Sequence, residues 1–154
     1  MVVIIGGGKF SEEVSAYFKY PIVGFDHIFD KPVKGILAIG SPRYKEICAN
    51  NLKKVIWTNL KHQDARCYSK VDCEGVLILP GSIVTTNVIL GDHVSINLNC
   101  TIGHDCIIGC YTTIHPGCNI SGNVHIGRKC EIGTNTCIIP GVRIGDNVVI
   151  GARS

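Results

Sequence analysis

Residues 96–132 read INLNCTIGHDCIIGCYTTIHPGCNISGNVHIGRKCEI, and this stretch contains the pattern that decides the fold. Every sixth residue in it is isoleucine, from Ile96 to Ile132. The period extends in both directions without a break, so an aliphatic residue recurs in thirteen successive hexads. Such a period indicates a repeat architecture. The thirteen positions are Ile78, Val84, Leu90, Ile96, Ile102, Ile108, Ile114, Ile120, Ile126, Ile132, Ile138, Ile144 and Ile150.

Two further positions of the hexad define its geometry. Four residues after each aliphatic residue lies a small or β-branched residue, from Ser82 to Ser154, and we expect both positions to point inward. Three residues after it, eight of the thirteen positions are Gly or Asn, which tolerate positive φ and therefore predict corners. Three hexads then make one coil of a triangular prism, with neighbouring coils stacked as parallel strands about 4.8 Å apart. The predicted corners are Gly81, Asn87, Asn99, Gly117, Asn123, Asn135, Gly141 and Asn147, and Ile-Gly recurs at Gly91, Gly109, Gly127 and Gly145.

The first half of the chain has a different organisation, typical of a small α/β domain. Apolar runs predict strands, and each of two runs leads into a predicted helix. The glycine turn after the first run could face a phosphate, but Ser11 stands where a G-x-G-x-x-G fingerprint needs its third glycine. A domain that merely needs a tight turn is therefore the alternative. The predicted strands are 2–5, 22–25, 35–40 and 55–57, the helices are 11–18 and 41–47, and the domains are 1–60, a linker 61–75, and the prism 76–154.

Composition excludes several classes of protein. The net charge is +3 with scattered Lys and Arg, so no nucleic-acid surface is predicted. The start, MVVIIGGGKF, predicts neither a signal peptide nor a membrane span. The nine cysteines are odd in number and form no C-x-x-C pair, which favours reduced thiols in the cytoplasm. Four of them, Cys100, Cys106, Cys118 and Cys130, fall at inward positions and predict packing; a Cys100–Cys118 disulfide is disfavoured.

Four of the six histidines lie in the repeat, at different phases of the coil: His93, His104, His115 and His125. Different phases argue against three imidazoles converging on one zinc, as a γ-type carbonic anhydrase requires, although a site shared between subunits remains an alternative. His104 is followed by Asp105, and an imidazole oriented by a carboxylate is a natural base for acyl transfer. The alternative is an ordinary solvated corner histidine. Cys110 and Cys137 lie off the inward positions, but neither has a histidine in register to activate it.

Several segments together resemble the hexapeptide-repeat sugar O- and N-acyltransferases related to sialic acid O-acetyltransferase and to the UDP-4-amino-sugar N-acetyltransferase of bacillosamine synthesis. They are the glycine turn, 23–26 (VGFD), 38–40 (AIG), 97–109 and 120–127 (ISGNVHIG). The resemblance implies a Rossmann-like α/β domain followed by a left-handed parallel β-helix. It also implies an acetyl-CoA-dependent acetyltransferase acting on a nucleotide-linked amino sugar, without a metal and as a homotrimer.

The resemblance also implies site residues. His104 matches the family's base and Asp105 its acidic partner, in the family's most specific motif. Substrate binding is implied for Gly8, Lys9, Asp26, Gly40 and Asn97, and acetyl-CoA binding for Thr113, Thr134 and Ala152. Three departures stand beside the matches: Thr113 replaces a second family histidine, Lys9 replaces a glycine, and the sequence ends at Ser154 where relatives continue, which predicts a truncated chain. A sugar O-acetyltransferase and a non-catalytic sugar-nucleotide-binding homologue are the alternatives, and the sequence names neither the sugar nor the acceptor atom.

Overall fold

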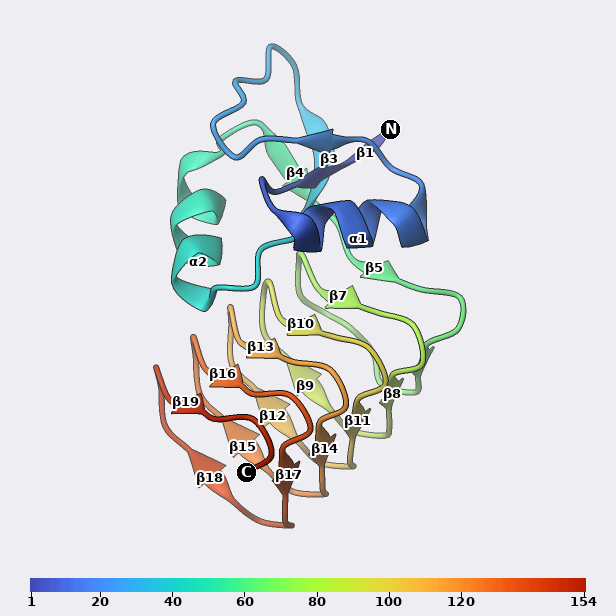
Figure 1. Ribbon diagram of the computed structural model, residues 1–154, viewed down its shortest axis with the longest axis vertical. Helices are drawn as coiled ribbons and strands as arrows, with labels where there is room; N and C mark the ends of the chain where they lie inside the picture. The colour runs from blue at the N-terminus through green and yellow to red at the C-terminus, as the bar shows by residue number, and fades with distance from the viewer.

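A computed structural model describes residues 1–154 as an α/β unit seated on one face of a long triangular prism (Figure 1). The α/β unit contains one parallel sheet in the order β2-β1-β3-β4, and its four strands lie within or overlap the four apolar runs that predicted strands. Its strands are β1 (Val2–Ile5), β2 (Ile22–Val23), β3 (Val33–Leu37) and β4 (Val55–Trp57), and its helices are α1 (Lys9–Phe18) and α2 (Pro42–Asn51).

The two helices begin for different reasons. Helix α2 follows Ser41, which takes the N-cap position in an extended conformation, and Pro42 occupies the first turn as its fixed φ favours. Helix α1 begins at Lys9, two residues before the expected start, because the glycine turn leads directly into it. It ends at Phe18, and the next residue, Lys19, caps it with a left-handed φ of 59° and donates its N–H to the carbonyl of Ser15. Strand β2 covers only Ile22–Val23, shorter than expected.

The prism has three parallel sheets, here called the first, second and third faces in chain order. The first face consists of β5 (Leu60–Lys61), β7 (Leu77–Ile78), β10 (Ser95–Ile96), β13 (Thr113–Ile114), β16 (Glu131–Ile132) and β19 (Val149–Ile150). The second consists of β6 (Arg66–Cys67), β8 (Ile83–Val84), β11 (Thr101–Ile102), β14 (Asn119–Ile120) and β17 (Cys137–Ile138). The third consists of β9 (Ile89–Leu90), β12 (Ile107–Ile108), β15 (His125–Ile126) and β18 (Arg143–Ile144).

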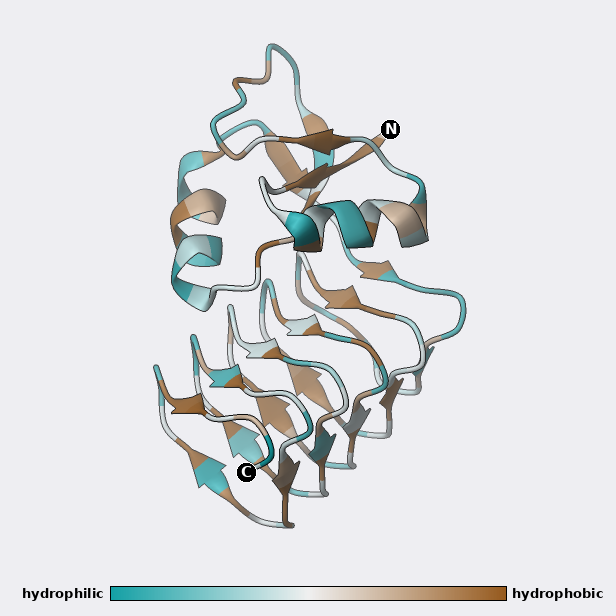
Figure 2. Cartoon of the chain, viewed as in Figure 1, coloured by the Kyte–Doolittle hydropathy of each residue, from teal (hydrophilic) through white to brown (hydrophobic).

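The predicted inward positions form the prism core. The aliphatic residues from Ile78 to Ile138 are at most 7% exposed, and the cysteines at inward positions are fully buried. All nine cysteines are free, and the thiols of Cys100 and Cys118 lie 3.1 and 3.0 Å from the carbonyl oxygens of His115 and Gly133. In the last coil the inward positions are half-buried, and Ser154 is exposed. Figure 2 shows brown, hydrophobic segments that recur on successive coils of the prism between pale and teal, more polar segments.

All eight predicted corners adopt a positive φ, and so do the five residues at the same hexad position that are neither Gly nor Asn. Local sequence gave no sign of these five, because a left-handed conformation is unfavourable for most side chains. The register of the stacked coils imposes it on them. The five are His93, Asp105, Tyr111, Lys129 and Arg153, with φ between 53 and 65°.

Steric crowding between coils explains the recurring Ile-Gly pair. A Cβ atom on Gly109 would lie 2.5 Å from the carbonyl carbon of Gly127 in the next coil. A Cβ on Gly91 would lie as close to the backbone nitrogen of Cys110. Backbone atoms cannot move aside as a side chain can, so these positions require glycine. Gly145 is the exception in the series, because nothing lies within 4 Å of its ideal Cβ.

The prediction that residues 61–75 form a linker between the two domains is wrong. Strand β5 pairs in parallel with β7, and β6 pairs with β8, so this segment extends two faces of the prism. Ala65 is buried in the prism core, and Cys67, Val71 and Cys73 pack against it. Residues 61–75 do not follow the hexad pattern, so the sequence does not indicate this additional coil.

The first face of the prism carries the α/β unit. Val14 of α1 shares a buried cluster with Ile4 and Ile36 of the sheet and with Leu77 and Leu79 of the prism. On the side of α2, Lys45 is fully buried and reaches the prism backbone, while Glu46 pairs with Arg128 and Lys129. The two units therefore share a core. Neither helix has the length and apolarity needed to cross a membrane.

Candidate active site

His104 and Asp105 lie together at the corner between the second and third faces. The corner follows β11, and Asp105 holds its left-handed position with a φ of 60°. The Nδ1 atom of His104 lies 2.7 Å from Oδ2 of Asp105. Their side chains are 67% and 53% exposed, so both are open to a ligand in the single chain. The sequence pattern predicted this pair, and the structure brings the two side chains into contact at a left-handed corner of the coil.

A third residue extends the pair. Asn87 occupies the same corner one coil earlier, and its Nδ2 donates to Oδ1 of Asp105 at 3.3 Å. Hydrogen bonds from His104 and then Asn87 lower the pKa of Asp105 below its usual value. The ionised carboxylate favours a hydrogen on Nδ1 of His104, which leaves Nε2 with the lone pair that a general base needs.

The imidazole lies against Gly122 in the next coil. An ideal Cβ on Gly122 would be 2.6 Å from Nε2 and 2.7 Å from Cε1 of His104. The three atoms nearest to that position all belong to the His104 ring. The absent side chain therefore leaves the space in which the ring and its Nε2 atom lie.

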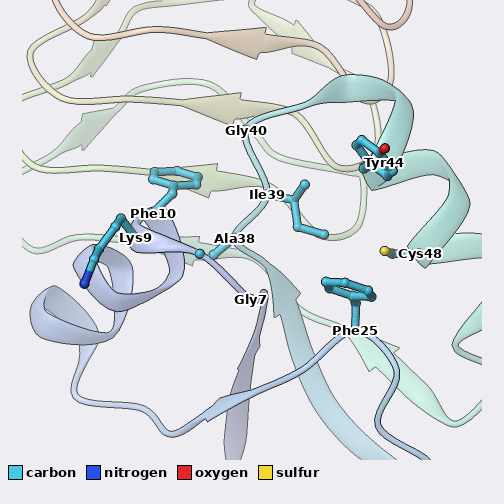
Figure 3. A pocket seen from close by; sticks show the side chains of 10 residues that line it. Gly7, Lys9, Phe10, Phe25, Ala38, Ile39, Gly40, Tyr44 and Cys48 are labelled. Carbon is cyan, nitrogen blue, oxygen red and sulfur yellow. The ribbon is translucent and has the colours of Figure 1, made fainter.

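A separate pocket of about 510 Å³ opens at the carboxyl ends of β1 and β3. Its walls include Phe10, Phe25, Ile39 and Tyr44, together with the glycine turn and Gly40 (Figure 3). Strands β2 and β3 flank β1 on opposite sides, so this is the point where the strand order reverses, the usual ligand crevice of an open parallel sheet. The starts of both helices lie beside it, and unpaired N–H groups there favour an anion.

The predicted substrate residues differ in how they meet this pocket. Gly8 and Gly40 line it, with no atom within 4 Å of either ideal Cβ, so a ligand can approach their backbone closely. The Lys9 side chain is 92% exposed and pairs with Glu12 at 2.8 Å, and Figure 3 shows it pointing away from the pocket. Asp26 is exposed next to Phe25, with its carboxylate turned toward Gly24. Gly8 and Gly40 are thus the better placed of the four.

The remaining predicted residues lie elsewhere on the prism. Asn97 follows β10 on the first face, is 8% exposed, and uses its Oδ1 to accept the N–H of Leu98. Thr113 is 1% exposed on the same face, and its Oγ1 has no hydrogen-bond partner. Thr134 and Ala152 are exposed at the corner between the first and second faces. In one chain none of these shares a corner with His104.

The other histidines of the repeat are on separate surfaces. His93 is buried at the corner between the third and first faces, His115 pairs with Glu131 at 2.8 Å on the first face, and His125 lies beside Arg143 on the third. No group of three or more His, Cys, Asp or Glu side chains is arranged to hold a metal ion. The separation that the phases predicted is confirmed.

The His104 corner and the pocket lie on opposite sides of one chain. The α/β unit is seated on the first face, and the corner between the second and third faces is the edge of the prism opposite that face (Figure 1). A ligand in the pocket of one chain is thus separated from His104 of the same chain by the thickness of the prism.

Comparison with known proteins agrees with this architecture. Residues 123–154 match the family model described as bacterial transferase hexapeptide (six repeats). The prism is a left-handed β-helix of hexapeptide repeats. A search of curated proteins gives no match.

Solved structures of three named proteins are similar to nearly the whole of this chain. PerB from Caulobacter crescentus, solved with CoA and GDP-perosamine, is 25% identical, with a TM-score of 0.87 over 98% of this chain and 86% of that one. The acetyltransferase domain of PglB from Neisseria gonorrhoeae is 24% identical, with a TM-score of 0.84 over 98% and 88%. WeeI from Acinetobacter baumannii is 22% identical, with a TM-score of 0.86 over 99% and 89%.

Sequence reasoning missed Asn87, Gly122 and the aromatic walls of the pocket. The signal for the first two was present, because Asn87 precedes Asp105 by one coil of 18 residues and Gly122 follows His104 by the same step. Stacked coils bring residues at that spacing side by side, so the register alone could have found them. The pocket walls had no such signal, since they come from separate segments.

Proposed function

We propose that this protein is an acetyl-CoA-dependent acetyltransferase that N-acetylates a nucleotide-linked amino sugar, with His104 as general base. The observation that carries the proposal is the His104–Asp105 pair, exposed on a hexapeptide-repeat prism at 2.7 Å. The likeness to PerB, solved with CoA and GDP-perosamine at 25% identity, supports the donor and the substrate class. The acetyl-CoA complex of the PglB domain, at 23% identity, is in accord with it.

The mechanism that we propose is direct transfer. The acceptor nitrogen attacks the thioester carbonyl carbon while Nε2 of His104 takes its proton, and a backbone N–H stabilises the oxyanion. The carbon–sulfur bond then breaks, and the proton on His104 passes to the CoA thiolate. Asp105 orients the ring and stabilises its protonated form during the step. No covalent acyl-enzyme is needed.

The pocket in the α/β unit is the proposed site for the nucleotide part of the substrate. Its aromatic walls suit stacking with a base or a sugar, and Gly8 and Gly40 allow a diphosphate to approach the two helix starts. Asp26 remains a proposed contact for the ribose or base at its rim. We keep Lys9 only as a group that could turn toward a phosphate by breaking its exposed pair with Glu12.

We further propose a homotrimer, in which one chain supplies the nucleotide-sugar pocket and its neighbour supplies His104. A single chain holds the two on opposite sides, so an association of chains is needed to join them. Exposed Ile89 and Ile107, 61% and 37% exposed on the third face, provide apolar surface for such a contact. Asn97, Thr134 and Ala152 would then reach the acetyl-CoA site across a subunit boundary. The free cysteines favour the cytoplasm as the compartment.

Thr113 is the weakest of the proposed acetyl-CoA contacts. Its side chain is 1% exposed beneath the α/β unit, so a contact with acetyl-CoA requires its backbone or a displacement of α2. The Thr113→Val variant tests a contact through the side chain: a rise in the KM for acetyl-CoA supports it, and an unchanged KM shows that the hydroxyl does not contact acetyl-CoA.

The experiment for the function is a transfer assay with a panel of acceptors. The intact protein is incubated with acetyl-CoA and nucleotide-linked sugars that carry either a free amine or only hydroxyls, with both UDP and GDP carriers. Release of the CoA thiol together with an acetylated amino sugar supports the proposal. Acetylation of a hydroxyl sugar instead identifies a sugar O-acetyltransferase. Binding of the nucleotide sugars without turnover identifies a non-catalytic binding protein.

A further inference from the structure

The corner that carries His104 is built from three successive coils, and two of its residues fall outside the catalytic pair. Asn87 lies one coil before Asp105, and Gly122 lies one coil after His104. Both contacts follow from the stacking of the coils: Asn87 donates to Asp105 at 3.3 Å, and Gly122 lies against the imidazole.

We propose that Asn87 and Gly122 are positioning residues for His104, Asn87 by fixing the Asp105 carboxylate and Gly122 by leaving the space in which the imidazole and its acceptor meet. This inference rests on the proposed function for its kinetic consequences. The expected change in the geometry of the His104 ring does not depend on the proposed function.

The role of Asn87 follows from the two oxygens of Asp105. Oδ2 accepts from His104, and Oδ1 accepts from Asn87, so the carboxylate is held from both ends. Without Asn87 the carboxylate, 53% exposed, can rotate about its last bond and exchange its partner for water. Asn87 has a φ of 56°, so glycine preserves its backbone and removes only the amide.

The role of Gly122 follows from where a methyl group would fall. The nearest atoms to its ideal Cβ all belong to the His104 ring, at 2.6, 2.7 and 3.0 Å, and none belongs to the backbone. Gly122 does not have a positive φ, so alanine is conformationally permitted there. A methyl group therefore costs the prism little. At 2.6 Å from Nε2 it must displace the His104 ring, and it also occupies the space through which an amine would approach Nε2.

One glycine and one asparagine in the last complete coil provide matched controls for Gly122→Ala and Asn87→Gly. Gly145 has no atom within 4 Å of its ideal Cβ, so Gly145→Ala introduces the same methyl group without a clash. Asn147 has a left-handed φ of 59° and lies at a different corner, so Asn147→Gly makes the same change as Asn87→Gly away from His104.

The test joins a spectroscopic readout to kinetics in the full chain. Imidazole NMR signals of His104, assigned by their loss in His104→Gln, report the Nδ1 hydrogen bond whether or not the protein is active. In Gly122→Ala and Asn87→Gly we expect these signals to shift, and in the two controls we expect them to stay. In turnover we expect kcat to fall about 100-fold in Gly122→Ala, as for a displacement of about 1 Å, and about tenfold in Asn87→Gly, with KM for acetyl-CoA nearly unchanged.

The outcomes separate this inference from the function on which it builds. Unchanged His104 signals in both variants overturn the positioning roles, even if activity falls. Equal losses of kcat in the variants and their controls also overturn them, because a general loosening of the prism would then be the cause. Shifted signals in a protein that acetylates no acceptor leave the positioning roles standing and refute the acetyltransferase.

Discussion

The Nζ atom of Lys45 lies 3.0 Å from the main-chain oxygen of His93, with no exposed surface on the lysine. This contact fastens helix α2 to the first face of the prism. Nζ also lies 3.2 Å from Oγ of Ser95 and 3.1 Å from the carbonyl oxygen of Thr112, so one amine spans two coils. This contact therefore helps to set the position of the proposed nucleotide-sugar pocket relative to the prism.

Replacing Lys45 by methionine should destabilise the protein. The side chain keeps its approximate volume, but it leaves buried oxygen acceptors without their donor, at a cost of about 1–3 kcal/mol. Chemical unfolding of Lys45→Met measures the loss, and Lys53→Met, at an exposed position of the segment after α2, should change the free energy of unfolding by less than about 0.5 kcal/mol. A Lys45→Met protein as stable as the wild type would show that the amine adds nothing to the contact.

The same lysine should make stability depend on alkaline pH. Burial lowers the pKa of Lys45 from 10.5 to about 7, while the charge of Glu131 acts to raise it. Between these values the unfolded chain binds a proton that the folded protein releases, so stability rises with pH. Relative to Lys45→Met, the wild type should gain up to about 1.4 kcal/mol for each pH unit above 7. Parallel pH profiles of the two proteins would contradict a lowered pKa.

His93 should make the stability of the protein depend on acidic pH. Burial lowers its pKa to about 4, and the charge of Asp92 acts to raise it. Below the ordinary pKa of about 6.5 the unfolded chain gains a proton first, so stability is lost as the pH falls toward 4. The ring is stacked on Tyr111 with centroids 5.3 Å apart and meets the edge of Trp57 at 4.8 Å.

Phenylalanine at position 93 keeps these ring contacts but cannot be protonated. Tyr111 shows that an aromatic residue tolerates the left-handed corner in the next coil. Unfolding of His93→Phe between pH 6.5 and 4 should therefore show a weaker loss of stability than the wild type. An equally steep loss would assign the acid sensitivity to another group.

Glycine at the start of a corner should be essential where coils approach closely. Gly109→Ala places a Cβ 2.5–2.7 Å from three backbone atoms of the next coil, and we expect a loss of about 1–3 kcal/mol or more from overpacking. Gly145→Ala occupies the same phase of the coil in open space and should be nearly neutral. Thermal unfolding of the pair makes the comparison; similar melting temperatures would mean that the stacked coils separate easily.

The repeat made the prism predictable because its signal is strictly local and periodic. The aliphatic residues from Ile78 to Ile138 are buried where the period of six places them, and Asn87 and Asn123 form corners as their residue type suggests. The coil over residues 61–75 was missed because its inward residues, among them Ala65 and Cys67, do not follow the hexad. Five further corners were missed because stacking, not residue preference, sets their backbone.

The candidate site was predictable only in part. Adjacent residues such as His104 and Asp105 can be paired from sequence, since the turn between them is short. The burial of Thr113 and Lys45 could not be foreseen, because it arises where α2 meets the first face and depends on how the α/β unit packs against the prism. The distance between the His104 corner and the pocket has the same origin.

Acetyl transfer by the wild type and by His104→Ala, measured with acetyl-CoA and the panel of nucleotide-linked sugars, tests the central claim most directly. The account predicts that the wild type acetylates a nucleotide-linked amino sugar on nitrogen. It predicts that His104→Ala lowers kcat about 10²–10⁴-fold, because the positioned base is lost, while the protein unfolds at the wild-type temperature. An N-acetylated product formed at the wild-type rate by His104→Ala, or the absence of any acetylated amino sugar with the wild type, would contradict it.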